Sequence, residues 1–92
     1  MKEKEERMFD LKLSNVAKRF LVKCDKVLYE RLVIKLKDLQ HNPFPSDVKR
    51  VKGRVEKIFR VRVGDYRILY LVIKEKNLLF VSDIDKRSKI YY

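Results

Sequence analysis

The stretch FRVRVGDYRILYLVI, residues 59–73, decides the fold. On both sides of Gly64 and Asp65, apolar residues either alternate with arginines or form a continuous run, as is typical of β-strands. A Gly-Asp pair suits a two-residue hairpin turn with the glycine at its first position. The sequence therefore predicts an antiparallel hairpin with strands at 58–63 and 66–73.

The turn also sets the register of this hairpin, in which Arg62 faces Arg67 and Arg60 faces Leu69. Because side chains alternate between the faces of a sheet, the two strands divide into an apolar set and a basic set. The apolar set is Phe59, Val61, Val63, Tyr66, Ile68 and Tyr70. The basic set on the opposite face is Arg60, Arg62 and Arg67.

Upstream of the hairpin, residues 9–13 alternate as in a strand, and Ser14-Asn15 offers the N-cap of a helix that ends near Cys24. Asp25 can cap a second helix, whose apolar stripe contains Leu28, Leu32, Leu36 and Leu39. The prolines of Asn42-Pro43-Phe44-Pro45 end that helix. We expect a loop from there to about Val55.

Downstream, residues 78–84 form a third strand-like run after a short polar turn at 75–77. The predicted order is β-α-α-β-β-β, an α+β fold with an N-terminal αα-hairpin packed on one face of a mainly antiparallel sheet. The other face can stay open. A chain of 92 residues suits a single domain, 1–92, of which we expect residues 1–7 to be flexible.

The net charge is +11, from 24 Lys and Arg against 13 Asp and Glu. Residues 1–46 carry 11 basic and 7 acidic groups, whereas residues 47–92 carry 13 and 6. Such an excess favours a polyanionic partner, with nucleic acid as the first suspect and an acidic protein as an open alternative. The binding surface is expected mainly in the second half.

Other classes find little support. The longest apolar run, at 68–73, has six residues, whereas a membrane span needs about 20. The single cysteine, Cys24, excludes an intrachain disulfide, and the N-terminus lacks a signal-peptide core, so a cytoplasmic location is expected. Cys24 lies on an apolar stripe and is expected to be buried and inert. A lone histidine, His41, supports no metal site, and no cofactor is indicated.

The basic strand residues could hold phosphate. Like charges directly opposite each other destabilise a sheet, and a phosphate between Arg62 and Arg67 would reverse that effect. Arginine's planar fork suits bidentate phosphate contacts. The alternative is a solvated face, or salt bridges to acidic residues of the tail.

Two further basic segments are candidate nucleic-acid contacts. The predicted loop contributes Lys49, Arg50, Lys52 and Arg54, and the C-terminal segment contributes Lys86, Lys89 and Tyr92. Tyrosine beside arginine can stack on a base. Equally, a charge run is usually solvated, and a terminal tyrosine is more often a packing residue.

The segment FRVRVGDYRILY at 59–70, followed by KRSKIY at 86–91, resembles the RelE/ParE toxin superfamily, as does Leu39-x-x-Asn42-Pro43 after the second helix. For RelE-like members, the resemblance implies a ribosome-dependent endoribonuclease that cuts messenger RNA in the 30S A site through the 2′-hydroxyl. It also implies an acidic RelB-like antitoxin and a toxin–antitoxin hetero-oligomer.

Carried over by position, the resemblance implies a catalytic set of Arg60, Arg62, Arg67, Arg87 and Tyr91. Arg67 and Arg87 would hold the scissile phosphate with support from Arg62, and Tyr91 would stack or take part in proton transfer. Related enzymes often carry lysines where Arg60 and Arg62 stand. Because the pKa of arginine lies above about 12, arginine is a poor general base, and proton abstraction is left without a clear owner.

Two alternatives remain at the level of sequence. ParE-like members share the scaffold and inhibit DNA gyrase, so the fold alone does not choose between the targets. A non-enzymatic basic module that binds RNA or an acidic protein requires only the charge.

Overall fold

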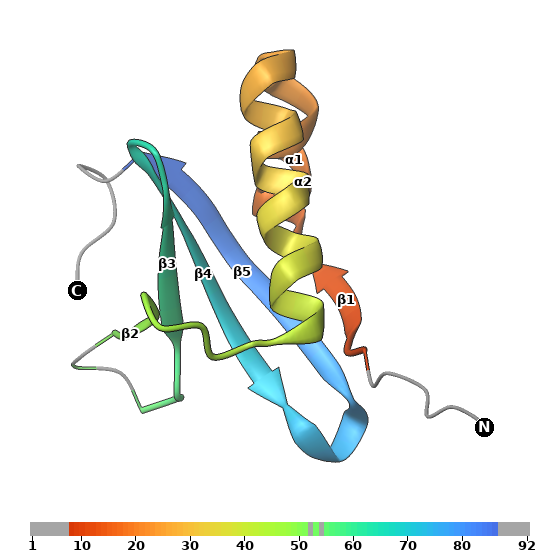
Figure 1. Cartoon of the computed structure of the whole chain (residues 1–92), viewed down its shortest axis with the longest axis vertical. Helices are drawn as coiled ribbons and strands as arrows, with labels where there is room; N and C mark the ends of the chain where they lie inside the picture. Colours follow the sequence, from red (N-terminus) through yellow and green to blue (C-terminus); the bar gives the residue numbers. More distant parts are fainter. Residues whose placement is uncertain (1–7, 52, 54, 87–92) are drawn as a thin grey trace.

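The computed structural model describes residues 8–51, 53 and 55–86. Residues 1–7, expected to be flexible, lie outside this range. The elements follow the order β1 (Asp10–Leu13), α1 (Asn15–Lys23), α2 (Lys26–His41), β2 (Lys49–Arg50), β3 (Phe59–Val63), β4 (Tyr66–Ile73), a 3₁₀ turn η1 (Lys74–Lys76) and β5 (Leu78–Lys86). Figure 1 shows the two helices on the same side of the sheet, which confirms the predicted α+β architecture.

The sheet has five strands in the order β1-β5-β4-β3-β2. Strand β1 runs parallel to β5, and the other neighbours are antiparallel. The β3–β4 hairpin has the predicted register, with Arg62 opposite Arg67 and Val63 opposite Tyr66. Gly64 has a φ of 60°, a conformation that a side chain would strain, so the glycine permits the tight turn.

The helices begin at the predicted caps. The Ser14 hydroxyl accepts a hydrogen bond from the Ala17 amide at 3.0 Å, and the Asp25 carboxylate accepts one from the Leu28 amide at 2.8 Å. Both bonds satisfy amides that the first turn of a helix leaves without a partner. The two helices form the expected αα-hairpin, and none in the described part of the chain is long and apolar enough to cross a membrane.

The core lies between this helical layer and the face of the sheet that carries the predicted apolar set. Its buried members are Ala17, Leu21, Leu28, Leu32, Leu36, Leu39, Val61, Val63, Ile68, Tyr70, Leu79, Val81 and Ile84. Each fully buried aliphatic side chain contributes about 1.5–3 kcal/mol. The Tyr70 hydroxyl crosses the edge of this core and donates a 2.6 Å hydrogen bond to the Pro43 carbonyl.

Two predicted boundaries are wrong. The segment predicted as a loop contains β2, because Lys49 and Arg50 pair with the edge of β3, and the Val51 amide donates to the Ile58 carbonyl at 2.8 Å. The last strand continues two residues beyond Ile84, because Asp85 and Lys86 pair with the start of β4. Both extensions depend on a neighbouring strand and have no periodic signal of their own.

Candidate nucleic-acid interface

Cross-strand pairing arranges the basic residues in two rows on the sheet face away from the helices, called here the arginine face. One row contains Lys49, Arg60, Leu69 and Asp83, on β2, β3, β4 and β5 respectively. The second row contains Arg62, Arg67 and Asp85. Each row therefore places two cations side by side, where like charges destabilise a sheet by a few tenths of a kcal/mol or more.

Arg67 occupies the centre of the second row and is only 3% exposed. Its Nη1 donates to the Tyr66 carbonyl at 3.3 Å, whereas its Nε has no hydrogen-bond partner among the described residues. Burying a charged group with incomplete hydrogen bonding costs free energy, so native proteins do it rarely, and a role in binding or catalysis is one explanation of such a position. The sequence predicted the face of Arg67 correctly but not its burial.

The other two arginines are more accessible. Arg62 is exposed beside the β3–β4 turn, and Arg60 is half-buried opposite Lys49. The exposed Arg62 is next to the buried Arg67 in the pairing, so the pair can offer one guanidinium to solvent and one set back in the sheet. This arrangement suits an anion that approaches from outside and is desolvated as it binds.

An apolar cluster shares the arginine face. Val51, Ile58 and Leu69 are buried together, with Leu71 packed against them. The sequence had allowed this face to stay open, but the cluster covers part of it. This cluster fixes the segment after β2 against the sheet, and it supports the row that contains Lys49 and Arg60.

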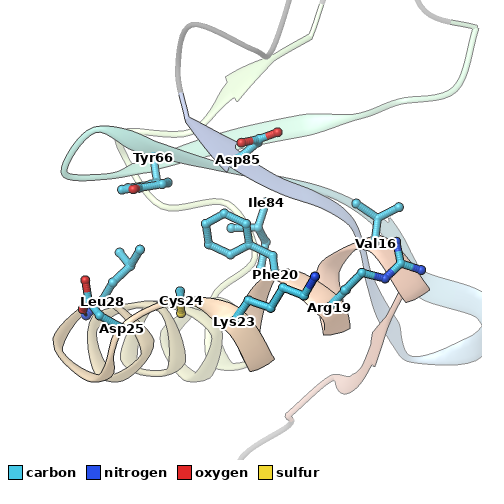
Figure 2. A pocket seen from close by; sticks show the side chains of 10 residues that line it. All are labelled: Val16, Arg19, Phe20, Lys23, Cys24, Asp25, Leu28, Tyr66, Ile84 and Asp85. Atoms are coloured by element: carbon cyan, nitrogen blue, oxygen red, sulfur yellow. Dashed lines mark hydrogen bonds between the residues drawn. The ribbon is translucent and has the colours of Figure 1, made fainter.

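The sequence analysis did not predict that two carboxylates lie on the arginine face. A β-bulge in β5 lies between the pairs Tyr70–Val81 and Leu69–Asp83, with Ser82 as the extra residue. The bulge shifts the alternation of β5, so Ile84 enters the core while Asp83 and Asp85 lie opposite Leu69 and Arg67. Figure 2 shows Ile84 directed toward the helices and Asp85 on the other side of β5.

The bulge is held by hydrogen bonds from both neighbours. The Ser14 hydroxyl, which caps α1, donates to the Ser82 carbonyl at 2.8 Å, and the Ser82 hydroxyl donates to the Leu69 carbonyl at 3.3 Å. A helix cap thus helps to determine which face the acidic residues of β5 occupy. No local pattern in residues 78–86 could have indicated this.

The remaining predicted contacts divide into three groups. Lys49 lies on the arginine face, and its role as a nucleic-acid contact stays a prediction. Arg50 and Lys86 pair with Phe59 and Tyr66, whose side chains face the helices, so the register places these two cations on the opposite side. The other predicted residues, Lys52, Arg54, Arg87, Lys89, Tyr91 and Tyr92, lie outside the described range.

A separate cleft of about 370 Å³ lies between α1 and the paired ends of β4 and β5 (Figure 2). Its apolar lining includes Phe20, Leu28 and Ile84, and Asp85 lies at its rim, so the cleft reaches the end of the row that contains Arg67. Cys24 also lines it and is half-buried, so the prediction of a buried cysteine was wrong. Burial raises the pKa of the Cys24 thiol, and nearby Asp25 raises it further, which keeps the thiol protonated.

No group of three or more His, Cys, Asp or Glu side chains with the geometry of a metal site occurs among the residues that the structure describes. The chemical groups that converge on the arginine face are guanidinium, ammonium and carboxylate.

Comparison with protein families gives a match over most of the chain. The model of the family described as "ParE toxin of type II toxin-antitoxin system, parDE" matches residues 11–91. A RelE1 toxin of Methanocaldococcus jannaschii is 34% identical over 59 residues, which cover 61% of this chain and 64% of that protein. The match thus spans less than two thirds of the relative's length.

Solved structures show the same fold. The chain resembles one from an archaeal RelE–RelB complex of Pyrococcus horikoshii with a TM-score of 0.76 and 23% identity, covering 90% of this chain and 99% of the other. It also resembles one from the RelBE toxin–antitoxin complex of Escherichia coli, with a TM-score of 0.73, 23% identity, and coverage of 85% and 95%. At these identities the likeness shows a shared two-helix, five-strand architecture.

Proposed function

The chain belongs to the family of ParE toxins of type II toxin–antitoxin systems, and we propose that it acts as the toxin of such a pair by cutting messenger RNA in the ribosomal A site. Residues of the arginine face would bind the RNA, and the 2′-hydroxyl of the substrate would attack the adjacent phosphate. This activity is ribonucleolytic and requires no cofactor.

The paired cations of the arginine face carry the proposal. Lys49 beside Arg60 and Arg62 beside Arg67 repel each other in the free protein. A phosphodiester backbone that lies across the two rows converts this repulsion into attraction, and its affinity should fall steeply with salt. Among the described residues, buried Arg67 Nε has no hydrogen-bond partner, and a phosphate oxygen would supply one if the guanidinium turned toward the ligand.

We assign the roles by combining this geometry with the family resemblance. Arg67 would hold the scissile phosphate with Arg62, and Arg60 and Lys49 would bind a neighbouring phosphate. Arg87 would complete the phosphate site, and Tyr91 would stack on a base or take part in proton transfer. These last two roles rest on the resemblance alone.

The proposed partner that restrains the toxin is an acidic antitoxin. The related structures are described as RelE–RelB complexes, and the net charge of +11 favours a partner of opposite charge. We propose a toxin–antitoxin hetero-oligomer in the cytoplasm, where the ribosomes are. Its association should weaken as salt rises, because screening reduces long-range attraction.

The decisive experiment is expression in a translating extract, with messenger-RNA ends mapped by primer extension. The wild type should create new ends confined to translated messages. Arg62→Ala should reduce cleavage at least about tenfold, and Arg67→Met by about a hundredfold, because each removes a phosphate contact. Lys18→Ala is the control: it removes an exposed cation from α1, on the other side of the sheet, and should leave cleavage unchanged.

A gyrase-directed toxin is the second candidate, favoured by the ParE description of the matching family. Purified protein would then inhibit DNA supercoiling by gyrase and leave messages intact. If neither messages nor supercoiling change, and the protein still binds RNA, the non-enzymatic binding module is the better explanation.

A further inference from the structure

The arginine face has cations for binding phosphate, but arginine holds its proton too strongly to take one from a 2′-hydroxyl. A lysine could serve, yet Lys49 lies on β2, two strands from Arg67, which is roughly 10 Å at the usual strand spacing. Within the described part of the chain, the site around Arg67 therefore needs another proton acceptor.

Asp85 is the titratable side chain next to Arg67 in the pairing of β4 with β5. It is half-buried, and its Oδ1 accepts a 2.7 Å hydrogen bond from the Lys86 amide, which orients the carboxylate. Among the described residues, no ion pair within 4.0 Å joins Asp85 to Arg67. Charged groups near it include Arg62, across β4 in the same row, and Asp83, two positions earlier on β5. Asp85 also lines the cleft beside α1, together with Arg19, Lys23 and Asp25.

We propose that Asp85 is the general base of RNA cleavage, an assignment that rests on the proposed nuclease function. Cross-strand neighbours have Cβ atoms about 4.5–5.5 Å apart. A 2′-oxygen roughly 3–3.5 Å from a phosphorus held by Arg67, and about 2.6–3.2 Å from a carboxylate, fits between two such side chains. The substrate is then RNA with the ribose on the β5 side of its phosphate.

The reaction follows from this placement. Asp85 takes the proton of the 2′-hydroxyl, and the 2′-oxygen uses the freed electron pair to bond to phosphorus. The bond from phosphorus to the 5′-oxygen breaks, and that oxygen leaves with the bonding pair and takes a proton from water. The resulting hydroxide is neutralised by the proton that Asp85 returns to solvent. The products are a 2′,3′-cyclic phosphate and a 5′-hydroxyl.

Asp85→Asn separates this role from phosphate binding. It keeps the size of the side chain but cannot accept the proton, so the single-turnover cleavage rate should fall by about 10²- to 10⁴-fold. RNA affinity should stay the same or increase, because a negative charge leaves a basic face. A residue that merely positions Arg67 would lose affinity together with rate. Asp85→Glu, which restores a carboxylate, should recover part of the rate.

The pH profile gives an independent readout. With a carboxylate base, the wild-type rate should fall at acid pH and be flat above that limb. Without it, the rate of Asp85→Asn should rise about tenfold per pH unit, as hydroxide takes over. Asp10→Asn, the same change at an exposed position of β1, should match the wild type.

The outcomes distinguish the two proposals. If the wild type cleaves RNA and Asp85→Asn cleaves equally fast with the same pH profile, Asp85 is not the base, and the nuclease function stands. If Asp85→Asn loses rate and affinity together, Asp85 is a positioning residue and the assignment is overturned. If the wild type does not cleave RNA in any translating extract, the nuclease function fails and the base with it.

Discussion

The two faces of the sheet bury different kinds of side chain, with opposite effects on stability. The helix-covered face buries apolar side chains, with Leu32, Ile68 and Tyr70 fully inaccessible. The arginine face buries a guanidinium, Arg67, beside a cluster of only a few apolar residues. The first arrangement stabilises the fold, whereas the second opposes it. A feature that opposes folding therefore supports the hypothesis of a role in binding or catalysis.

The neighbours Ile68 and Leu69 provide the largest test of this contrast, since they lie on one strand and point to opposite faces. Ile68→Ala should lower the free energy of unfolding by about 4 kcal/mol, because a close-packed core leaves a cavity. Leu69→Ala should lower it by about 2 kcal/mol, because a small cluster near the surface can collapse or admit water. Urea unfolding of both variants measures the difference. Equal losses would show that the two faces contribute alike to stability.

Arg67→Met should change the free energy of unfolding in the opposite direction. Methionine fills the space of the arginine stem and removes a buried charge, so unfolding should require roughly 1–2 kcal/mol more free energy, while RNA binding weakens. The matched control is Arg62→Met, an exposed position that should change stability by less than about 0.5 kcal/mol. If Arg67→Met proves less stable than the wild type, Arg67 is a structural residue, and the contrast between the faces is weaker than argued.

The features predicted from sequence are those with a local cause. The turn at Gly64 fixed the register of β3 with β4, the caps Ser14 and Asp25 started the helices, and apolar spacing identified the buried face. Features that depend on distant partners were missed. Strand β2 has two residues and exists only against β3, and the bulge at Ser82 depends on a side chain from the start of α1.

The candidate site divides in the same way. Alternation placed Arg60, Arg62 and Arg67 on one face, but it gave no signal that Arg67 is buried while Arg62, opposite it, is exposed. Asp85 was predicted to follow the last strand, and its pairing with Arg67 emerged only from the register of β5. The roles of Arg87 and Tyr91 remain predictions.

Ser14→Ala tests whether the cap of α1 holds the bulge in β5. It removes the cap of α1 and the hydrogen bond to Ser82, so stability should fall by about 1–2 kcal/mol. Asp25→Ala, which removes the cap of α2, should cost about 1 kcal/mol. Amide hydrogen exchange at residues 82–86 should accelerate in Ser14→Ala only. Equal acceleration in both variants would mean that the cap does not hold the bulge.

Tyr70→Phe should have the smallest effect on stability of the variants considered, apart from the controls. It removes a hydrogen bond that links the core to the segment leading to β2. The Tyr70 hydroxyl lies in the core and donates to the Pro43 carbonyl, at the start of the segment that leads to β2, whose Lys49 lies on the arginine face. Losing this hydrogen bond should cost about 1 kcal/mol near neutral pH, whereas Tyr29→Phe, at an exposed position, should cost almost nothing.

The pKa of Tyr70 predicts how the stability difference between the wild type and Tyr70→Phe changes with pH. Burial raises the pKa of Tyr70 well above its ordinary value, and Asp47 raises it further. The folded state therefore binds the phenolic proton more tightly than the unfolded state, and this stability is complete below pH about 10. It is lost as pH rises from there through the folded pKa, so the advantage of the wild type over Tyr70→Phe should shrink in alkaline unfolding measurements. A constant difference would mean that the hydroxyl is not desolvated.

If RNA binding near neutral pH is unchanged in Tyr70→Phe, the arginine face keeps its arrangement without this hydrogen bond, and the positions of its cations depend on strand pairing alone.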